Sequence, residues 1–215
     1  MARAAQAAHR LPADIALVAV SKSCPVEGIG QAHAAGQTAF GENYVREAVK
    51  KITELAYLPL EWHFIGPIQS NKTRLIAENF QWVHSVEREK VAQRLNAARP
   101  DGMPPLNVCI QVNVSGEAAK SGVAPGEEVE LAAAIARLPR LRLRGLMAIP
   151  EPTSDVATQR RRYALLRELK DGLVARGYAL DTLSMGMSDD LEAAIAEGAT
   201  MVRVGTAIFG PRTKN

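Results

Sequence analysis

Apolar runs and amphipathic segments alternate along the 215 residues of the chain. The first apolar run, residues 15–22, is bounded by Pro12 and Pro25 and consists mostly of small and β-branched residues. Such a run is typical of a strand that is buried on both faces, as in a parallel sheet. The segments between the apolar runs have helical spacing of apolar positions and charged outer positions. The pattern therefore predicts strands that alternate with helices.

Eight strands are predicted, at residues 15–22, 38–43, 61–66, 81–86, 107–114, 141–149, 180–185 and 201–205. The predicted helices cover residues 25–35, 44–55, 70–78, 87–98, 127–138, 155–176 and 189–198, and a short helix covers about residues 1–10. Ser70 is predicted to cap the third of the helices between the strands. Eight strand-then-helix units predict an α/β protein with one (β/α)8 barrel over residues 1–215. A doubly wound open sheet fits the same alternation.

Lys22 is the unexpected residue of the first strand. Alternation of side chains along the strand places it on the same face as Val18 and Val20. Removal of an ammonium group from water lowers its pKa and makes the amine a better nucleophile for Schiff-base chemistry. The simpler interpretation is that Lys22 extends into solvent or pairs with a carboxylate such as Glu42.

The carboxyl ends of the predicted strands are more polar than the strand bodies. In a barrel these ends surround the active site. They carry Lys22, Asn43, His63, Asn113, Met147, Ser184 to Ser188, Arg203, Gly205 and Thr206. This distribution favours a functional role for Lys22.

The loops after the seventh and eighth strands are the usual phosphate-binding segments of a barrel. Here they contain residues 184–188 and Gly205-Thr206. Glycines let backbone N–H groups approach an anion, and Ser188 and Thr206 supply hydroxyl groups. Asp189 and Asp190 are predicted in the first turn of the next helix, where they would repel phosphate if they faced it. A Ser-capped helix and an ordinary glycine turn are the simpler interpretation.

Arg203 is a second charged residue within a predicted buried strand. It is flanked by Val202 and Val204, and alternation points it away from them. An internal arginine stays protonated and needs an acceptor, which is either a protein carboxylate or a ring nitrogen of a ligand. A lysine suited to Schiff-base chemistry, a phosphate site and an arginine directed at a heterocycle together indicate pyridoxal 5′-phosphate (PLP).

Composition excludes several other classes of function. The net charge is only +3, and the densest basic cluster, Arg160 to Arg162, lies in a helical pattern as a solvated face, which argues against nucleic-acid binding. The two cysteines, Cys24 and Cys109, form no metal motif and are typical of reduced thiols in a cytoplasmic protein. Cys109 is predicted to fill the core, and Cys24 to border the same cavity as Lys22. No signal segment and no membrane-spanning stretch are evident.

Five segments carry a resemblance to a known family. They are Val20-Ser21-Lys22, residues 40–47 (FGENYVRE), residues 63–72 (HFIGPIQSNK), residues 184–190 (SMGMSDD) and residues 202–210 (VRVGTAIFG). These segments resemble the pyridoxal phosphate homeostasis proteins, the YggS/PROSC family. The resemblance implies one (β/α)8 barrel similar to the cofactor-binding domain of alanine racemase.

The same resemblance implies roles for single residues. Lys22 would carry the internal aldimine, Arg203 would face the pyridine nitrogen, and Asn43 and Met147 would line the pocket. Ser188, Gly205 and Thr206 would hold the phosphate, and Ser184 and Met185 would also belong to the cofactor site. Lys120-Ser121-Gly122 also resembles a family motif and would guide cofactor entry or form a second site, although a solvated lysine turn is the simpler account.

The sequence favours a carrier over an enzyme. An arginine at the pyridine nitrogen weakens the ring as an electron sink. In two-domain racemases a tyrosine from the partner subunit supplies the second acid/base group, whereas Tyr44, Tyr57, Tyr163 and Tyr178 fall in predicted helices or loops. The leading hypothesis is a cytoplasmic monomer without strong catalytic activity that buffers PLP and delivers it to apo-enzymes, in vitamin B6 and amino-acid homeostasis. The alternatives are a slow racemase-like PLP enzyme and a cofactor-free Schiff-base aldolase that uses Lys22.

Overall fold

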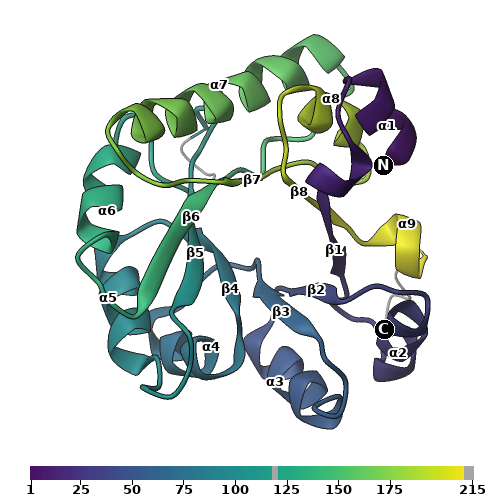
Figure 1. Cartoon of the computed structure of the whole chain (residues 1–215), viewed down its shortest axis with the longest axis vertical. Helices are drawn as coiled ribbons and strands as arrows, with labels where there is room; N and C mark the ends of the chain where they lie inside the picture. The colour runs from purple at the N-terminus through teal and green to yellow at the C-terminus, as the bar shows by residue number, and fades with distance from the viewer. Residues whose placement is uncertain (118–120, 211–215) are drawn as a thin grey trace.

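Eight parallel strands close into a barrel in the order β1 to β8 (Figure 1). The computed structural model describes residues 1–117 and 121–210. The strands are β1 (Ala16–Val20), β2 (Ala39–Glu42), β3 (Glu61–Phe64), β4 (Trp82–Val86), β5 (Leu106–Gln111), β6 (Leu141–Met147), β7 (Thr182–Ser184) and β8 (Met201–Val204). Parallel pairing of β1 with β8, from Ala16 with Met201 to Ala19 with Val204, closes the sheet. The barrel prediction is confirmed and the open sheet is excluded.

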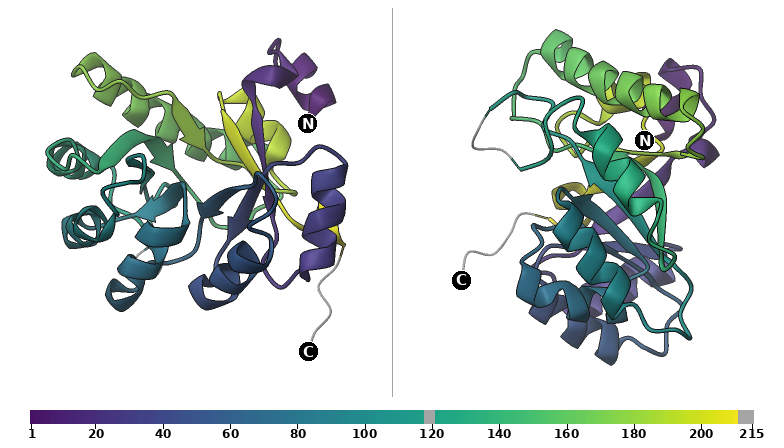
Figure 2. Two further views of the ribbon diagram at one scale, coloured as in Figure 1. Left: turned by 60° about the horizontal axis from the view of Figure 1, so that its bottom comes forward. Right: turned by 90° about the vertical axis from the view of Figure 1, so that its left-hand side faces the viewer.

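Helices surround the barrel on its outer side (Figures 1 and 2). They are α2 (Val26–Ala34), α3 (Val45–Glu54), α4 (Thr73–Asn79), α5 (Glu89–Ala98), α6 (Glu128–Ile135), α7 (Val156–Ala175), α8 (Leu191–Ala196) and α9 (Thr206–Phe209), together with the short 3-10 helices η1 (Pro12–Asp14) and η2 (Ser70–Lys72). Each of the helices between two strands was predicted. The short helix α9 was not predicted, because its four residues are too few to show helical spacing of apolar positions.

Element ends depart from the predictions where local turns take over. Strand β1 ends at Val20 rather than at Lys22, because the Cys24 N–H donates to the Ser21 carbonyl and Ser23 adopts φ = 61°. Ser70 caps no helix: it begins η2, and its carbonyl accepts from the Thr73 hydroxyl. Turns of this kind reverse the chain within four residues and end the strand pattern early.

The amino-terminal helix α1 (Ala2–Ala7) is anchored to α8, the helix that follows β7. Ala4 and Ala5 are buried. Arg10 donates from Nη1 to the carbonyl oxygens of Ile195 and Ala199, at 3.1 and 2.6 Å. Ile195 belongs to the last turn of α8 and Ala199 follows that helix, so the cation of Arg10 complements the carboxyl end of α8. The predicted short helix is thus present and docked.

Apolar side chains form one large core cluster, which contains buried residues of most strands and helices, and one small cluster. The small cluster holds Trp82, Cys109 and Met147. Cys109 is fully buried, as predicted for a core residue, and burial raises the pKa of its thiol to about 12. Trp82 stacks on His63 with ring centroids 5.5 Å apart, so the small cluster adjoins polar side chains of the strands.

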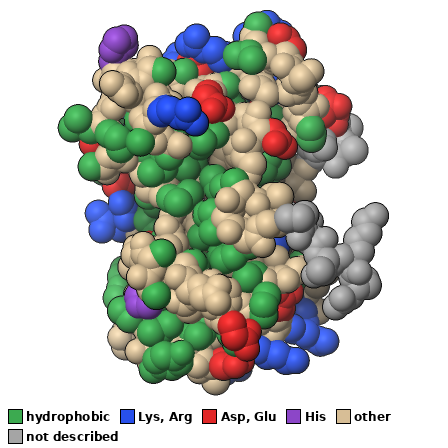
Figure 3. All heavy atoms as spheres, turned by 90° about the vertical axis from the view of Figure 1, so that its right-hand side faces the viewer, with side chains coloured by type: hydrophobic (Ala, Val, Ile, Leu, Met, Phe, Trp, Pro, Cys, Tyr) green, Lys and Arg blue, Asp and Glu red, His purple; other side chains and the backbone are tan. Residues whose placement is uncertain are grey.

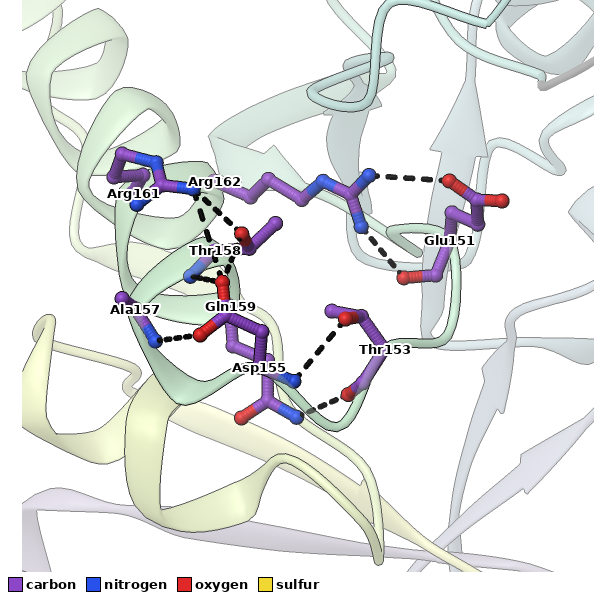
Figure 4. Close-up of polar contacts among 8 residues, drawn as sticks. All are labelled: Glu151, Thr153, Asp155, Ala157, Thr158, Gln159, Arg161 and Arg162. Atoms are coloured by element: carbon purple, nitrogen blue, oxygen red, sulfur yellow. Dashed lines mark hydrogen bonds and ion pairs between the residues drawn. The ribbon is translucent and has the colours of Figure 1, made fainter.

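The arginine run at the start of α7 is engaged with acidic groups of the barrel. Asp155 caps the helix by accepting from the N–H groups of Ala157 and Thr158, and Arg162 pairs with Glu151 at 3.2 Å (Figure 4). Arg160 pairs with Glu197, at the carboxyl end of α8, at 2.7 Å. These pairs favour the expected solvated helix face over a nucleic-acid site.

On the face of the barrel beside β1 and β8 the covering helices α1 and α9 are short. Leu17 of β1 is half-buried and packs against the core. Figure 3 shows hydrophobic side chains on this face between α1 and α2. No helix in residues 1–117 or 121–210 combines the length and apolar character that crossing a bilayer requires.

Candidate functional site

A pocket of about 610 Å³ opens at the carboxyl ends of the strands. Its volume is within the range of small-molecule sites. Its wall is built from the ends of β1 and β8 and the loop after β7. The lining residues are Val20, Lys22, Ser23, Cys24, Pro25, Met187, Ser188, Asp189, Arg203, Gly205, Thr206, Ala207, Phe209 and Gly210.

Five of the nine predicted site residues line this pocket together. They are Lys22, Ser188, Arg203, Gly205 and Thr206. Val20 also lines it, but β1 ends at Val20 and Lys22 lies in the turn that follows, so the predicted strand alternation does not extend to Lys22. Cys24 lines the pocket as well, as the sequence predicted.

The other four predicted residues lie outside the lining. Met147 and Met185 are fully buried, Met147 in the small cluster with Trp82. Ser184 is also fully buried and contacts Arg203. Asn43 is half-buried, and its Oδ1 is enclosed without a hydrogen-bond partner. Lys120, the residue of the family-like loop motif, lies outside the described residues.

Lys22 is held through the residues on either side of it. The Ser21 carbonyl accepts from Lys51 Nζ at 2.8 Å, and the Ser23 N–H donates to Glu47 Oε1 at 2.7 Å. Ser23 has a left-handed backbone, which is unusual for a residue with a side chain and is stabilised here by that hydrogen bond. Since Lys51 also pairs with Glu47 at 2.6 Å, one network fixes both neighbours of Lys22.

The same network contains a buried carboxylate, Glu42 at the end of β2. Its Oε1 accepts from Lys51 Nζ at 2.9 Å and from the Ser21 hydroxyl at 2.7 Å, while its Oε2 has no partner. Burial raises the pKa of Glu42 above its usual range. The alternative that Glu42 pairs with Lys22 is therefore wrong, because Lys51 takes that place. The spacing of Glu47 and Lys51 on one helix turn was the only sequence signal for Lys51.

Arg203 is buried in β8 and meets two neutral acceptors. Its Nη1 donates to Ser184 Oγ at 2.6 Å, and its Nη2 donates to the Ala148 carbonyl at 2.8 Å. The alternative of a protein carboxylate as its partner is thus wrong. Because neither acceptor carries a negative charge, the guanidinium of Arg203 is suited to donate a further hydrogen bond to a ligand atom in the pocket.

A chain of hydrogen-bonded polar side chains extends from Arg203 through the barrel. Ser184 Oγ lies 2.7 Å from His84 Nδ1, His84 Nε2 lies 2.9 Å from His63 Nδ1, and His63 Nε2 lies 2.9 Å from Glu61 Oε1. We refer to Glu61, His63, His84 and Ser184 as the interior relay. Sequence reasoning assigned His63 to a strand end and missed His84.

A signal for the relay exists in the sequence. His63, His84, Ser184 and Arg203 are each the third residue of their strands, β3, β4, β7 and β8. Position within a strand does not give the level in the barrel, because His63 pairs with Trp82 and Ser184 pairs with Met201. The signal is only that each of these four strands carries a polar side chain among apolar ones, and which of these side chains meet depends on the register of the closed barrel.

The two buried histidines predict a loss of stability in mild acid. Burial lowers the pKa of His63, and lowers that of His84 still further with help from the charges of His63 and Arg203. In mild acid the unfolded chain therefore binds more protons than the folded protein does. The free energy of unfolding is highest above about pH 6.5 and falls as pH decreases, by at most about 1.4 kcal/mol per pH unit for each histidine. Urea unfolding at pH 7 and 5.5 measures this, and His84→Gln should show a smaller difference. An equal pH dependence in both proteins would contradict the prediction.

The loop after β7 is shaped by Gly186 and Asp190. Gly186 has φ = 94°, and a Cβ there would lie 2.5 Å from the Ala194 side chain. Asp190 accepts from the Met187 N–H and from the Tyr163 hydroxyl, both at 2.6 Å. Helix α8 begins only at Leu191, so the predictions that Ser188 caps it and that Asp189 and Asp190 form its first turn are wrong. Asp189 lines the pocket, whereas Asp190 stabilises the loop.

Tyr163→Phe tests the anchoring of this loop. Removal of the hydroxyl leaves Asp190 Oδ2 without the hydrogen bond from Tyr163, so we expect a loss of about 1 kcal/mol in the free energy of unfolding. Urea unfolding measures the change. Tyr57→Phe is the control, since Tyr57 is 77% exposed. Equal effects of the two substitutions would mean that the hydroxyl of Tyr163 does not stabilise the loop.

Comparison with known proteins places this pocket in context. The family model of the alanine racemase N-terminal domain matches residues 2–213. A pyridoxal phosphate homeostasis protein of Pseudomonas aeruginosa is 66% identical over 209 residues, covering 97% of this chain and 90% of that protein. Another, of Escherichia coli strain K12, is 56% identical over 215 residues, covering 97% of this chain and 91% of that protein.

Solved structures give the same picture. PipY of Synechococcus elongatus with PLP bound has 38% identity and a TM-score of 0.85, and the match covers 97% of this chain and 98% of that chain. An alanine racemase of Corynebacterium glutamicum has 19% identity and a TM-score of 0.74, over 97% of this chain and 59% of that chain. The second likeness concerns the fold alone.

Proposed function

This chain belongs to the family of the pyridoxal phosphate homeostasis proteins, and on that premise we propose that it binds PLP at Lys22, buffers it and delivers it to other proteins. Relatives that are 66% and 56% identical carry that name, and the similar PipY structure holds PLP. The observation that carries the proposal is the meeting of Lys22 and Arg203 in one pocket with the hydroxyls of Ser188 and Thr206.

The donors of the pocket fit the chemical groups of PLP. Lys22 offers a primary amine, Arg203 offers N–H donors, and Ser188 and Thr206 offer hydroxyls for an anion. Gly205 precedes α9 and has no side chain to cap it, so the first N–H groups of that helix are available beside these hydroxyls. Among the described lining residues are the cations Lys22 and Arg203 and the carboxylate Asp189, a set that suits an anionic ligand.

Each of the nine predicted site residues has a role in the proposed function. When bound, the cofactor supplies an aldehyde that forms a covalent bond with an amine. Lys22 provides that amine, Arg203 faces the ring nitrogen, and Ser188, Gly205 and Thr206 bind the phosphate. Ser184 positions Arg203 by accepting its hydrogen bond. Asn43, Met147 and Met185 support the pocket from outside its lining.

A carrier role fits the pocket better than catalysis. Within the described part of the chain, no tyrosine or histidine lines the pocket to act as a second acid/base group. Tyr163 is buried and bonded to Asp190, and Tyr57 is largely exposed. An arginine at the ring nitrogen also weakens the electron sink that a racemase needs.

The first experiment follows the absorbance of the protein as PLP is added. We expect a new band from the lysine-bound cofactor that borohydride removes, with the reduced adduct located on Lys22 by mass spectrometry. An amino acid incubated with the loaded protein in D2O should keep its α-proton. Exchange of that proton would support the slow racemase instead, and the absence of any band would favour a cofactor-free aldolase.

The proposal extends to partners, assembly and location. We propose a cytoplasmic monomer, formed by residues 1–215 as one domain, that transfers PLP to apo-forms of PLP-dependent enzymes. In support of a monomer, the exposed large hydrophobic side chains of the described residues, among them Leu11, Tyr57 and Val174, come from separate segments. Light scattering with the loaded protein, and activation of an apo-enzyme by it, test these points.

A further inference from the structure

The interior relay joins the pocket to the opposite rim of the barrel. His63, His84 and Ser184 are fully buried, and Arg203 is 3% exposed. Glu61 is the first residue of β3, and its side chain is 48% exposed. Because all strands are parallel, the start of β3 lies at the end of the barrel away from Lys22. The relay is thus a continuous hydrogen-bonded path between solvent and the pocket arginine.

The two ends of the relay determine the direction of its hydrogen bonds. A guanidinium only donates, so Ser184 Oγ accepts from Arg203. An ionised carboxylate only accepts, so Glu61 receives its hydrogen bond from His63 Nε2. A neutral imidazole has one N–H, which leaves His63 Nδ1 as an acceptor for His84 Nε2–H. His84 Nδ1 then accepts the hydroxyl hydrogen of Ser184.

The surroundings favour the neutral form of both histidines. Burial is the first cause of the lowered pKa of each, and for His84 the charges of His63 and Arg203 act in the same direction. The hydrogen bond from His63 holds the pKa of Glu61 below its usual range, so this end stays an acceptor.

Charged and titratable groups of other strands and helices also face the relay. Arg144 of β6 lies 4.8 Å from the Trp82 ring, which in turn stacks on His63. Asp190 acts on Arg203 through its charge, whereas Cys109 of β5 and Tyr163 of α7 stay neutral near pH 7 because burial raises the pKa of each. None of these groups replaces a hydrogen bond of the relay.

We propose that His84 and Ser184 are positioning residues for Arg203, and that Glu61 sets the direction of the hydrogen bonds on which this positioning depends. A donor in place of Glu61 would reverse both tautomers, and Ser184 Oγ would then receive hydrogen bonds from His84 and Arg203 at once. Its hydroxyl hydrogen would need a new acceptor in a packed interior. Glu61, an exposed residue on the far rim, thereby affects the affinity of the pocket for a ligand whose acceptor atom binds Arg203. This inference rests on the proposed function.

The tautomers of the cofactor-free protein test this inference directly. The chain has only 4 histidines, so ¹⁵N and ¹³C resonances of labelled imidazoles can be assigned with single His→Gln variants. We expect His63 and His84 to be neutral with the hydrogen on Nε2 at pH 7. Glu61→Lys should move it to Nδ1 in both, whereas Glu61→Gln, whose amide carbonyl still accepts, should not. Glu54→Lys, an exposed charge reversal in α3, is the control.

Affinity provides the second readout. Ser184→Ala should raise the Kd for PLP about tenfold, because Arg203 loses its buried acceptor. Ser85→Ala is the matched control, since Ser85 is also buried but bonds the Gly66 carbonyl. Unchanged tautomers in Glu61→Lys, or equal affinity of Ser184→Ala and wild type, would overturn the inference. Failure of the wild type to bind PLP would refute the proposed function alone, since the tautomers are measured without it.

Discussion

Lys22→Ala is expected to abolish the absorbance band that the wild type develops with PLP. The substitution removes the amine that forms the covalent bond, while Arg203, Ser188 and Thr206 remain in the pocket. Lys22 is half-buried and follows the end of β1, so we expect the free energy of unfolding to change by about 1 kcal/mol or less. The spectrum after reconstitution and a urea unfolding curve measure the two effects.

The control for this prediction is Lys90→Ala. Lys90 is an exposed lysine of α5, on a helix that contributes no residue to the pocket. PLP modifies exposed lysines at high concentration, so both variants are compared at one equivalent of cofactor. A band of wild-type intensity in Lys22→Ala that borohydride still removes would locate the covalent bond elsewhere and refute the assignment of Lys22.

The fold was predictable because its main determinants are local. Buried parallel strands are nearly continuous apolar runs, and the spacing between runs, such as residues 15–22 and 38–43, leaves room for one helix each. The strand ends were less predictable. The turn that ends β1 depends on Ser23, whose left-handed backbone is held by Glu47, a residue of the next unit.

Residues that line the pocket were predictable where strand ends and loops carry them. Lys22, Arg203 and Thr206 interrupt or follow apolar runs, which marks them as polar groups that need a partner. Side chains that act behind them were not predictable in the same way. His84 reaches Ser184 across the interior of the closed barrel, and Lys51 reaches Glu42 from α3 through the fold of the β1, β2 and α3 segments.

Lys51→Met is expected to reduce the free energy of unfolding by about 3 to 5 kcal/mol. Lys51 is 6% exposed and Glu42 is fully buried, so the substitution leaves a carboxylate inside the protein without its cation. The Ser21 carbonyl also loses its hydrogen bond from Nζ, and Glu47 loses its ion pair. Urea unfolding at pH 7 measures the loss, with Lys50→Met, an exposed neighbour on α3, as the control.

The pH dependence of this loss identifies Glu42 as its cause. The pKa of Glu42 is higher in the folded protein than in the unfolded chain, where it is near 4.5. Protonated Glu42 therefore contributes its full stability below pH 4.5, and this contribution is lost as pH rises through the folded pKa. Without Lys51 the pKa of Glu42 rises further, so the deficit of Lys51→Met should shrink as pH falls from 7 toward 5. Adding Glu42→Gln should recover part of the lost stability, because an amide needs no counter-charge. A deficit that stays constant with pH and persists in the double variant would assign the effect to packing of the Lys51 side chain instead.

Since the same network fixes Ser21 and Ser23, we also expect Lys51→Met to bind PLP more weakly than Lys50→Met does, because the residues that flank Lys22 are released together.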